Sequence, residues 1–408
     1  MRVRLEHKSS YIRGELKITG SKSESNRLLI LKALFPKIEI ENLSNSDDTK
    51  VTKDALNSTN SIINIHHAGT AMRFLTAYFS IQPDREIILT GSKRMQERPI
   101  RILVDALKDL GAEISYDKKN GYPPLKIIGK KISKSKVTLP ANISSQYVSA
   151  LMLIATYLEK GLTIDLVGEM TSVPYIMMTK TILDQLGFDI SYKKNQIQIA
   201  SATFIEPKIW AVESDWSSAS YFYSILALSK GGQINLSTFK KESNQGDSAL
   251  SEIYNSLGVV TSFHNGTIKL SKVEDLNVAK LINLDLRNTP DLAQTIAVSC
   301  LGLGIECKLS GLHTLKIKET DRLSALKIEM EKLGAKVDIS RNSLKLYPSP
   351  QLKNNIAINT YNDHRMAMAF APLALKVPII INDSQVVSKS YPTFWNDLKS
   401  IDFIKEII

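Results

Sequence analysis

Apolar positions recur with a helical period in several segments that end in the dipeptide Leu-Gly. The clearest segment opens at Pro99 and closes at Gly111, and its apolar positions fall on one face (Ile100, Leu103, Leu107 and Leu110). Proline at the start and glycine just after the end are typical of helix termini. Similar endings occur at Leu186-Gly187, Leu257-Gly258 and Leu333-Gly334, with glycine spacings of 76, 71 and 76 residues. Each ending predicts an amphipathic helix.

Alternating apolar and polar positions follow these helices. The clearest example runs from Val259 to Leu270 around His264-Asn265-Gly266. Asn-Gly between two alternating segments is a strong hairpin signal. We therefore expect a β-hairpin after each helix that ends in Leu-Gly.

A second kind of helix lies between these elements and is rich in Ala, Met, Leu and Ile on all sides. Such a helix is buried all round. Its openings carry small, polar or charged residues, near Ser21, Gly69, Ser144, Asp215, Asp291 and Asp363. The spacings are 48, 75, 71, 76 and 72 residues.

The repetition predicts six copies of strand–helix–strand–helix–hairpin, and therefore an α/β protein of two three-copy domains. We place the first domain at 14–213 and the second at 1–13 with 214–408. The first copy is short, because little sequence separates Asp48 from Gly69 and no Leu-Gly ending occurs there.

Composition agrees with two domains and limits the class of protein. The 408 residues are 43% hydrophobic, which indicates two globular cores. The N-terminus lacks the apolar core of a signal peptide, and no stretch reaches the ~18 apolar residues of a membrane span. Cys300 and Cys307 lie in apolar surroundings, so we expect no disulfide and a cytoplasmic location.

The formal net charge is +11, which fits either nucleic-acid binding or a site for small polyanions. Most lysines fall in predicted hairpins, as at Lys118-Lys119 and Lys193-Lys194, and aromatic residues are only 7%. The charge therefore does not favour nucleic acid. Instead, a buried helix with a cationic opening predicts an anion site, because its N-terminus carries free N–H groups and a positive partial charge.

Six clusters carry candidate chemistry at or near these openings. Lys22, Ser23 and Arg27 open the first buried helix, and Gly69 opens the second, where the backbone can approach a ligand closely. Arg94 and Arg98 precede the helix that starts at Pro99. The remaining residues are Ser144-Ser145-Gln146, the charged run from Lys316 to Arg322, and Asp363-His364-Arg365.

These clusters suit anions and proton transfer better than metals. Arginine binds carboxylate or phosphate bidentately, and a carboxylate such as Glu319 beside Lys318 and Arg322 suits proton transfer. Capping alone accounts for one of the two serines at 144–145. The six histidines show no ligand spacing, so we expect no metal.

Taken together, the clusters resemble the 5-enolpyruvylshikimate-3-phosphate synthase family. The motifs are 21-SKSxSNR-27, 68-AGTAMR-73, 94-RMxERPI-100, 318-KETDR-322 and 361-YNDHRMA-367. The resemblance runs from Ser21 to Lys389. It implies two domains of three βαβαββ units each, with the active site in the cleft between them.

The resemblance also implies an activity: transfer of the enolpyruvyl group of phosphoenolpyruvate to the 5-hydroxyl of shikimate 3-phosphate. It implies no cofactor, and a monomer that binds neither nucleic acid nor membrane. The proton-transfer positions are Asp291 and Glu319, assisted by Lys22 and His364. Shikimate 3-phosphate positions are Lys22, Ser23, Arg27, Ser144, Ser145, Gln146, Ser172, Tyr175, Asp291 and Lys318. Phosphoenolpyruvate positions are Lys22, Gly69, Arg94, Gln146, Arg322, Arg365 and Lys389.

The chain departs from the family pattern at His67, where Asn is common, and at Phe74, where Pro is common. Thr314 stands where a substrate-binding Asn is frequent, so we assign it no role. Two alternatives remain open. One is UDP-N-acetylglucosamine enolpyruvyl transferase, which uses a loop cysteine and a Lys-Asn pair where this chain has Lys22-Ser23. The other is a polyanion-binding repeat protein without catalysis.

Overall fold

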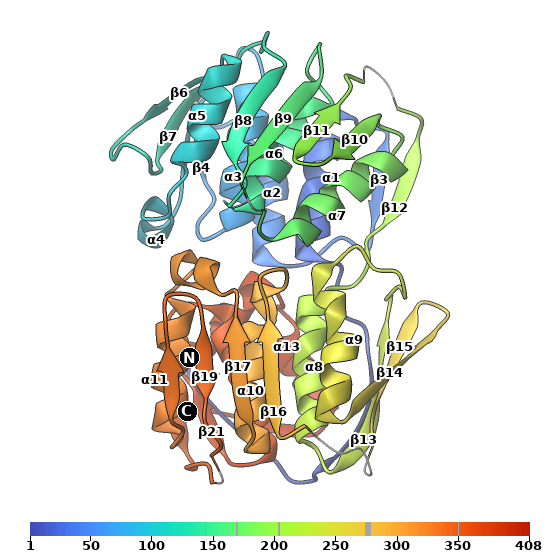
Figure 1. Ribbon diagram of the computed structural model, residues 1–408, viewed down its shortest axis with the longest axis vertical. Helices are drawn as coiled ribbons and strands as arrows, with labels where there is room; N and C mark the ends of the chain where they lie inside the picture. The colour runs from blue at the N-terminus through green and yellow to red at the C-terminus, as the bar shows by residue number, and fades with distance from the viewer. Residues whose placement is uncertain (143, 169, 203–204, 274–278, 350) are drawn as a thin grey trace. The chain divides into compact units, whose positions relative to one another are not determined.

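The computed structural model describes residues 1–408 except 143, 169, 203–204, 274–278 and 350 (Figure 1). The chain forms two compact units. We name residues 20–212 the N-terminal unit, and residues 1–19 with 213–408 the C-terminal unit. The predicted boundary at residue 14 falls within a strand of the C-terminal unit.

Buried helices form the centre of each unit, as the sequence predicts. In the N-terminal unit they are α1 (Lys22–Leu34), α3 (Gly69–Ser80) and α6 (Ser145–Ala155). In the C-terminal unit they are α8 (Trp216–Leu228), α10 (Ala293–Leu303) and α12 (His364–Phe370). Every residue of α3 and of α12 is buried. The six predicted openings coincide with the starts of these helices, except that a 3₁₀ turn, Pro290–Leu292, precedes α10.

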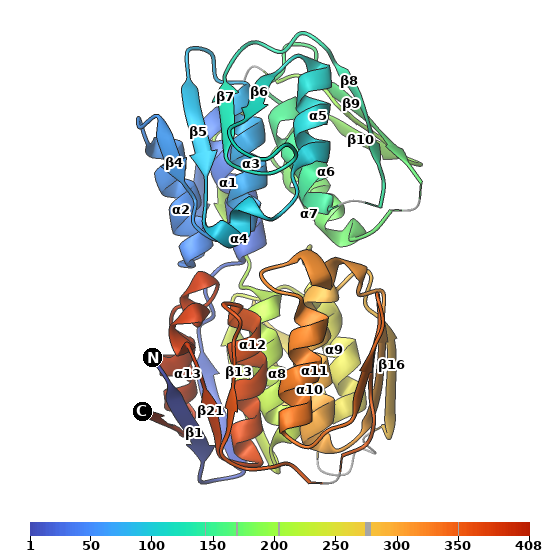
Figure 2. The same cartoon turned by 90° about the vertical axis from the view of Figure 1, so that its left-hand side faces the viewer.

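The remaining helices are more exposed. They are α2 (Asp47–Asn57), α4 (Lys93–Gln96), α5 (Arg101–Leu110) and α7 (Val173–Gln185) in the N-terminal unit, and α9 (Leu250–Ile253), α11 (Arg322–Lys332) and α13 (Phe394–Ser400) in the C-terminal unit. Figure 2 shows α11 beside α10. The helix predicted to open at Pro99 begins at Arg101, and Gly111 caps it with a left-handed φ of 111°, as its amphipathic pattern requires.

Two four-stranded sheets and one two-stranded sheet cover the described helices of the N-terminal unit. Their orders are β4-β5-β7-β6 (Ile62–Asn64, Glu86–Thr90, Leu125–Ile128, Glu113–Tyr116), β10-β11-β9-β8 (Ile190–Lys193, Gln196–Ile199, Leu162–Val167, Lys136–Pro140) and β12-β3 (Lys208–Ala211, Ile38–Glu41). The small sheet pairs β3, from the shortened first copy, with β12, which lies at the end of the unit.

Three four-stranded sheets cover the C-terminal unit over the same described range. Their orders are β14-β15-β13-β2 (Val259–His264, Thr267–Lys272, Gly231–Ser237, Tyr11–Leu16), β16-β17-β19-β18 (Leu281–Asp285, Glu306–Ser310, Leu344–Leu346, Val337–Ile339) and β20-β21-β1-β22 (Ile356–Ile358, Ile379–Ile381, Val3–His7, Phe403–Ile407). The hairpin predicted around Asn265-Gly266 joins β14 and β15, and both turn residues have positive φ.

Each unit contains paired strands that are distant from each other in the sequence. β2 pairs in parallel with β13 from Tyr11 to Leu16, and β1 lies between β21 and β22. β12 pairs in parallel with β3, and the Trp210 indole donates a 2.5 Å hydrogen bond to the Glu24 carboxylate of α1. The two-domain α/β architecture that the sequence predicts is confirmed.

Two further observations concern membrane-spanning helices and the cysteines. Across the described parts of the chain, no helix combines the length and apolarity needed to span a bilayer. Cys300 and Cys307 are free and buried, on α10 and β17.

Candidate active site

The C-terminal unit gathers charged residues around the start of α11. Arg322, the first residue of this helix, is 2% exposed and touches three carboxylates. Its Nε lies 2.7 Å from Asp363 Oδ2, Nη1 lies 2.8 Å from Asp291 Oδ1, and Nη2 lies 2.8 Å from Glu319 Oε2. Burial alone would lower the pKa of Arg322, but the three carboxylates outweigh it and raise that pKa.

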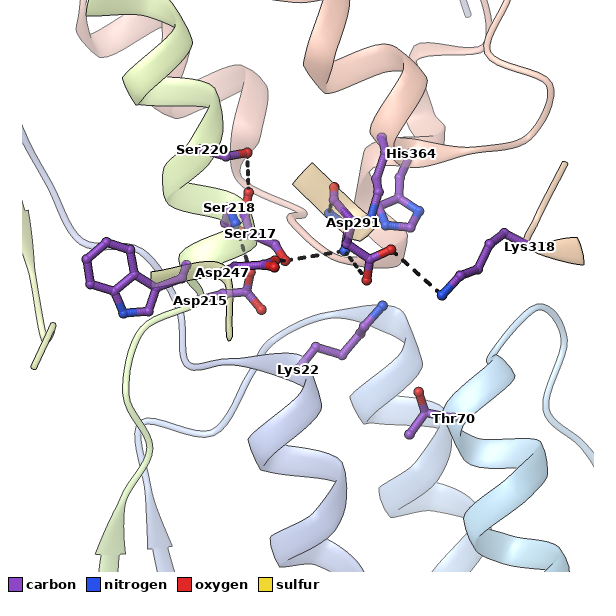
Figure 3. A network of polar contacts seen from close by, with 12 residues as sticks. Lys22, Thr70, Asp215, Ser217, Ser218, Ser220, Asp247, Asp291, Lys318 and His364 are labelled. Carbon is purple, nitrogen blue, oxygen red and sulfur yellow. Dashed lines mark hydrogen bonds and ion pairs between the residues drawn. The ribbon is translucent and has the colours of Figure 1, made fainter. Parts of the chain in front are cut away.

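Further cations surround the same carboxylates. Arg365 Nη2 lies 3.2 Å from Asp291 Oδ2. Lys318 Nζ lies 3.8 Å from Asp291 Oδ1 (Figure 3). Lys389 Nζ lies 2.8 Å from Glu319 Oε1. We name this set the arginine network: Asp291, Lys318, Glu319, Arg322, Asp363, Arg365 and Lys389. It joins residues from four separate segments of the chain.

The arginine network shifts the ionisation of Asp291. Burial would raise its pKa, but Arg365, Lys318 and Arg322 together hold the pKa well below its usual range. Asp291 is therefore ionised at neutral pH, in contact with cations that also suit a phosphate or carboxylate ligand.

Helix capping explains how the sequence builds this network. Asp363 is the N-cap of α12, and its Oδ1 accepts the backbone N–H of Arg365 at 2.9 Å while the same carboxylate binds Arg322. His364 follows the cap and is 1% exposed, with its Nδ1 3.8 Å from Asp363 Oδ1. Residues 363–365 therefore hold their geometry through the start of the helix.

The N-terminal unit builds a different cluster around Arg27, on α1. Its Nε donates to Thr179 Oγ1 at 2.7 Å, Nη1 donates to the Ser23 carbonyl at 2.7 Å, and Nη2 donates to Ser149 Oγ at 3.1 Å and to the Tyr175 carbonyl at 3.2 Å. We name Arg27 and these four partners the Arg27 cluster. Burial lowers the pKa of Arg27 to about 10, against the opposing effect of Tyr175 and Glu24. The guanidinium also lies over the Phe74 ring, 5.4 Å from its centroid.

Other predicted site residues stand at neighbouring helix starts of the N-terminal unit. Lys22 begins α1, and its Nζ lies 3.4 Å from Asp48 Oδ2. Ser144 caps α6, Ser145 is buried behind it, and Gln146 Nε2 donates to Thr70 Oγ1 at 3.2 Å. Ser172 precedes α7 with a left-handed φ of 55°.

Gly69 and the two arginines after it fill different positions. A Cβ at Gly69 would lie 2.6 Å from Arg98 Nη1, so any larger residue would displace this buried guanidinium. Arg94 lies on the short α4, and its Nη1 forms an exposed ion pair with Glu97 at 3.2 Å. The sequence prediction gave Arg94 a substrate role and Arg98 none, whereas Arg98 is the arginine in contact with Gly69.

Sequence reasoning missed two side chains next to the arginine network. Ser217 Oγ donates a short hydrogen bond to Asp247 Oδ2 (Figure 3), and Arg365 Nη2 donates to Ser217 Oγ at 3.3 Å. Asp247 follows Gln245-Gly246 in a 3₁₀ turn, Gly246–Ala249. Its only sequence signal is a lone carboxylate after a glycine.

Comparisons with known proteins give one consistent result. The family model for EPSP synthase (3-phosphoshikimate 1-carboxyvinyltransferase) matches residues 56–398. A 3-phosphoshikimate 1-carboxyvinyltransferase from Bacteroides fragilis is 44% identical over 97% of this chain and 96% of its own length. One from Sulfurovum sp. is 37% identical over 96% of this chain and 97% of its own. A solved EPSP synthase from Acinetobacter baumannii has a TM-score of 0.79 at 19% identity, with full coverage of both chains, which shows a shared fold.

Proposed function

Because this chain belongs to the EPSP synthase family, we propose that it transfers the enolpyruvyl group of phosphoenolpyruvate to the 5-hydroxyl of shikimate 3-phosphate. This reaction is a step of the shikimate pathway, which leads to the aromatic amino acids. The observation that carries the residue assignment is the arginine network, in which Asp291 and Glu319 share one guanidinium.

The reaction needs two proton transfers in opposite directions. The 5-hydroxyl loses a proton as its oxygen attacks C2 of phosphoenolpyruvate, and the methylene carbon gains one, which gives a tetrahedral ketal. Phosphate then leaves while a methyl proton is lost. Asp291 and Glu319 are our candidates for these transfers, since the acid and the base exchange roles between the two steps. Lys22 and His364 assist.

The arginine network explains how an ionised, well-paired carboxylate becomes a base. Without substrate, the cations around Asp291 keep its pKa low. A substrate phosphate or carboxylate that takes up Arg365 and Lys318 withdraws their charge from Asp291. The pKa of Asp291 then rises, so that it can accept the hydroxyl proton.

The substrate roles follow the residues at the helix starts. We assign shikimate 3-phosphate to Lys22, Ser23, Arg27, Ser144, Ser145, Gln146, Ser172, Tyr175, Asp291 and Lys318. We assign phosphoenolpyruvate to Lys22, Gly69, Arg94, Gln146, Arg322, Arg365 and Lys389. Arg27 has four N–H donations to protein, which leaves at most one of its five N–H groups for a ligand. Among the α1 residues assigned to shikimate 3-phosphate, Lys22 and Ser23 therefore make most of the contact with this ligand.

The nucleotide-sugar alternative is not favoured. An enolpyruvyl transferase of that kind uses a cysteine on a loop, whereas Cys300 and Cys307 are both buried within secondary structure. Free, buried thiols also suit a reducing compartment, and we place the enzyme in the cytoplasm.

Phosphate release tests the assignment directly. The purified chain is offered phosphoenolpyruvate with shikimate 3-phosphate, and in a separate reaction with UDP-N-acetylglucosamine. We expect turnover with shikimate 3-phosphate alone. Turnover only with the nucleotide sugar would reject the proposal, and turnover with neither would favour a non-catalytic anion-binding protein.

A further inference from the structure

Asp247 lies next to the arginine network but has no part in the proposed proton transfers. It is 5% exposed, in the 3₁₀ turn that follows Gln245. The turn is held against the start of α8, because Gln245 Oε1 accepts the Trp216 N–H at 3.1 Å and Gln245 Nε2 donates to the Ser214 carbonyl at 2.8 Å. Asp247 therefore has a fixed position rather than a mobile one.

When Asp247 is ionised, the hydrogen bonds that link it to Arg365 through Ser217 have a single possible direction. A guanidinium only donates, so Ser217 Oγ must accept from Arg365 Nη2. The serine hydroxyl has one proton, which it donates to Asp247 Oδ2. Asp247 thus fixes the orientation of the hydroxyl whose lone pair faces Arg365.

Arg365 connects this chain of bonds to the candidate base. Its Nη1 donates to the Asp291 carbonyl at 3.2 Å, and its Nη2 lies 3.2 Å from the Asp291 carboxylate. We propose that Asp247 is a positioning residue of the enzyme, which holds Arg365 through the Ser217 hydroxyl in the orientation that binds the anionic part of phosphoenolpyruvate. This inference rests on the proposed function, in which Arg365 binds that substrate.

Three charged groups face Asp247 and set its ionisation. Burial raises the pKa of Asp247, as do Asp291 and Asp215, the N-cap of α8. Arg365 and the Ser217 hydrogen bond lower it, and together these effects place the pKa at about 7. Below pH 7 the carboxyl is neutral and can still accept from Ser217. Above pH 7 it adds a negative charge beside the cation that receives the substrate anion, and so weakens anion binding.

Steady-state kinetics from pH 6 to pH 8.5 test the role with saturating shikimate 3-phosphate. We expect Ser217→Ala to raise KM for phosphoenolpyruvate roughly tenfold at every pH, with a smaller change in kcat, because Arg365 loses a hydrogen bond made by a charged group. Asp247→Ala should do the same at pH 6, where the carboxyl is neutral, since the serine proton then has no fixed acceptor.

Asp247→Asn separates positioning from simple packing. Its amide oxygen accepts from Ser217, so we expect KM at pH 6 within about twofold of the unaltered enzyme. At pH 8.5 the variant should have the lower KM, by roughly fivefold, because it cannot ionise. Asp285→Asn, on an exposed carboxylate paired with Arg287, is the control and should follow the unaltered enzyme throughout.

A titration of the Asp247 carboxyl group needs no turnover. It therefore tests the positioning role separately from the proposed enzymatic function. Carboxyl-carbon NMR of the chain labelled at Asp should show the Asp247 pKa rising in Ser217→Ala and in Arg365→Ala, since both partners lower it. An unchanged pKa in both variants, or pH profiles of KM that run parallel for Asp247→Asn and the unaltered enzyme, would overturn the positioning role. If the unaltered chain lacks turnover, the proposed function fails while this titration still decides the coupling.

Discussion

The two units hold their central arginines in opposite ways. Arg322, in the C-terminal unit, is surrounded by the carboxylates of Asp291, Glu319 and Asp363. Arg27, in the N-terminal unit, is equally buried but is held by hydroxyl groups and backbone carbonyls. Both guanidinium groups are charged, but Arg322 is bound by anionic partners and Arg27 donates its hydrogen bonds to uncharged groups.

This difference separates two tasks. A cation whose partners are carboxylates responds to an arriving anion, because the anion competes with the carboxylates and changes their pKa. A cation whose partners are neutral does not have to give up a carboxylate before it attracts an anion. It therefore provides a constant positive potential. We infer that the arginine network sets the pKa values of the proton-transfer carboxylates. The Arg27 cluster instead holds an anion-binding helix start in a fixed shape with a fixed charge.

Arg322→Ala should produce the largest effect. It would leave three carboxylates, one of them fully buried, without their shared cation, and removal of one partner from a buried ion pair costs about 3–5 kcal/mol. Urea unfolding at pH 7 should show a loss of this size in the free energy of unfolding. Arg341→Ala, at an exposed turn position, is the matched control. A loss below about 1 kcal/mol, the value of a surface pair, would contradict the network.

Asp291→Asn should lower turnover by roughly 10²-fold or more, because the amide cannot accept the proton. Glu319→Gln should act alike. Binding of phosphoenolpyruvate, measured by calorimetry, should survive in both variants, since Arg322, Arg365 and Lys389 remain. Near-normal kcat in either variant would remove that residue from proton transfer.

Arg27→Lys should have an intermediate effect. An ammonium group cannot reproduce the planar fork that serves Thr179, Ser149 and the Tyr175 carbonyl, so we expect a loss of roughly 1–3 kcal/mol in the free energy of unfolding. KM for shikimate 3-phosphate should rise with little change in kcat. Arg85→Lys, whose guanidinium makes a hydrogen bond to the Ser58 carbonyl at 2.9 Å, is the control. Equal losses in the two variants would show that the Arg27 cluster has no special rigidity.

Phe74→Leu should have the smallest effect. It removes the ring beneath Arg27, an interaction that contributes about 0.5–1 kcal/mol at most sites. KM for shikimate 3-phosphate should rise about two- to fivefold. Phe188→Leu removes a buried ring that packs on Phe35 and should change stability but not KM. If both variants leave KM unchanged, Phe74 acts through packing alone.

Features of the fold that depend on local pattern were predictable from the sequence. The starts of α1, α3, α6, α8 and α12 coincide with the predicted openings, because cap chemistry and an all-round apolar composition are local signals. The start of α5 was placed two residues early. Pro99 lies in the turn before the helix, and Ile100 is the N-cap residue.

Contacts between distant segments were not predictable in the same way. The bond between Ser217 and Asp247 joins two helix starts 30 residues apart, and neither residue has a periodic or compositional signal. The same holds for Arg98 beside Gly69, where the fold and not the motif selects which of two nearby arginines approaches the glycine. The roles given to individual residues came from the family resemblance and stay predictions.

The early strands β1 and β2 have a consequence for the order in which the protein matures. Residues 20–212 form their unit from one continuous stretch, so this unit can fold while the ribosome is still translating. β1 must wait for β22, Phe403–Ile407, which is translated after residues 20–212. A strand translated before residues 20–212 therefore pairs with strands that are translated after them.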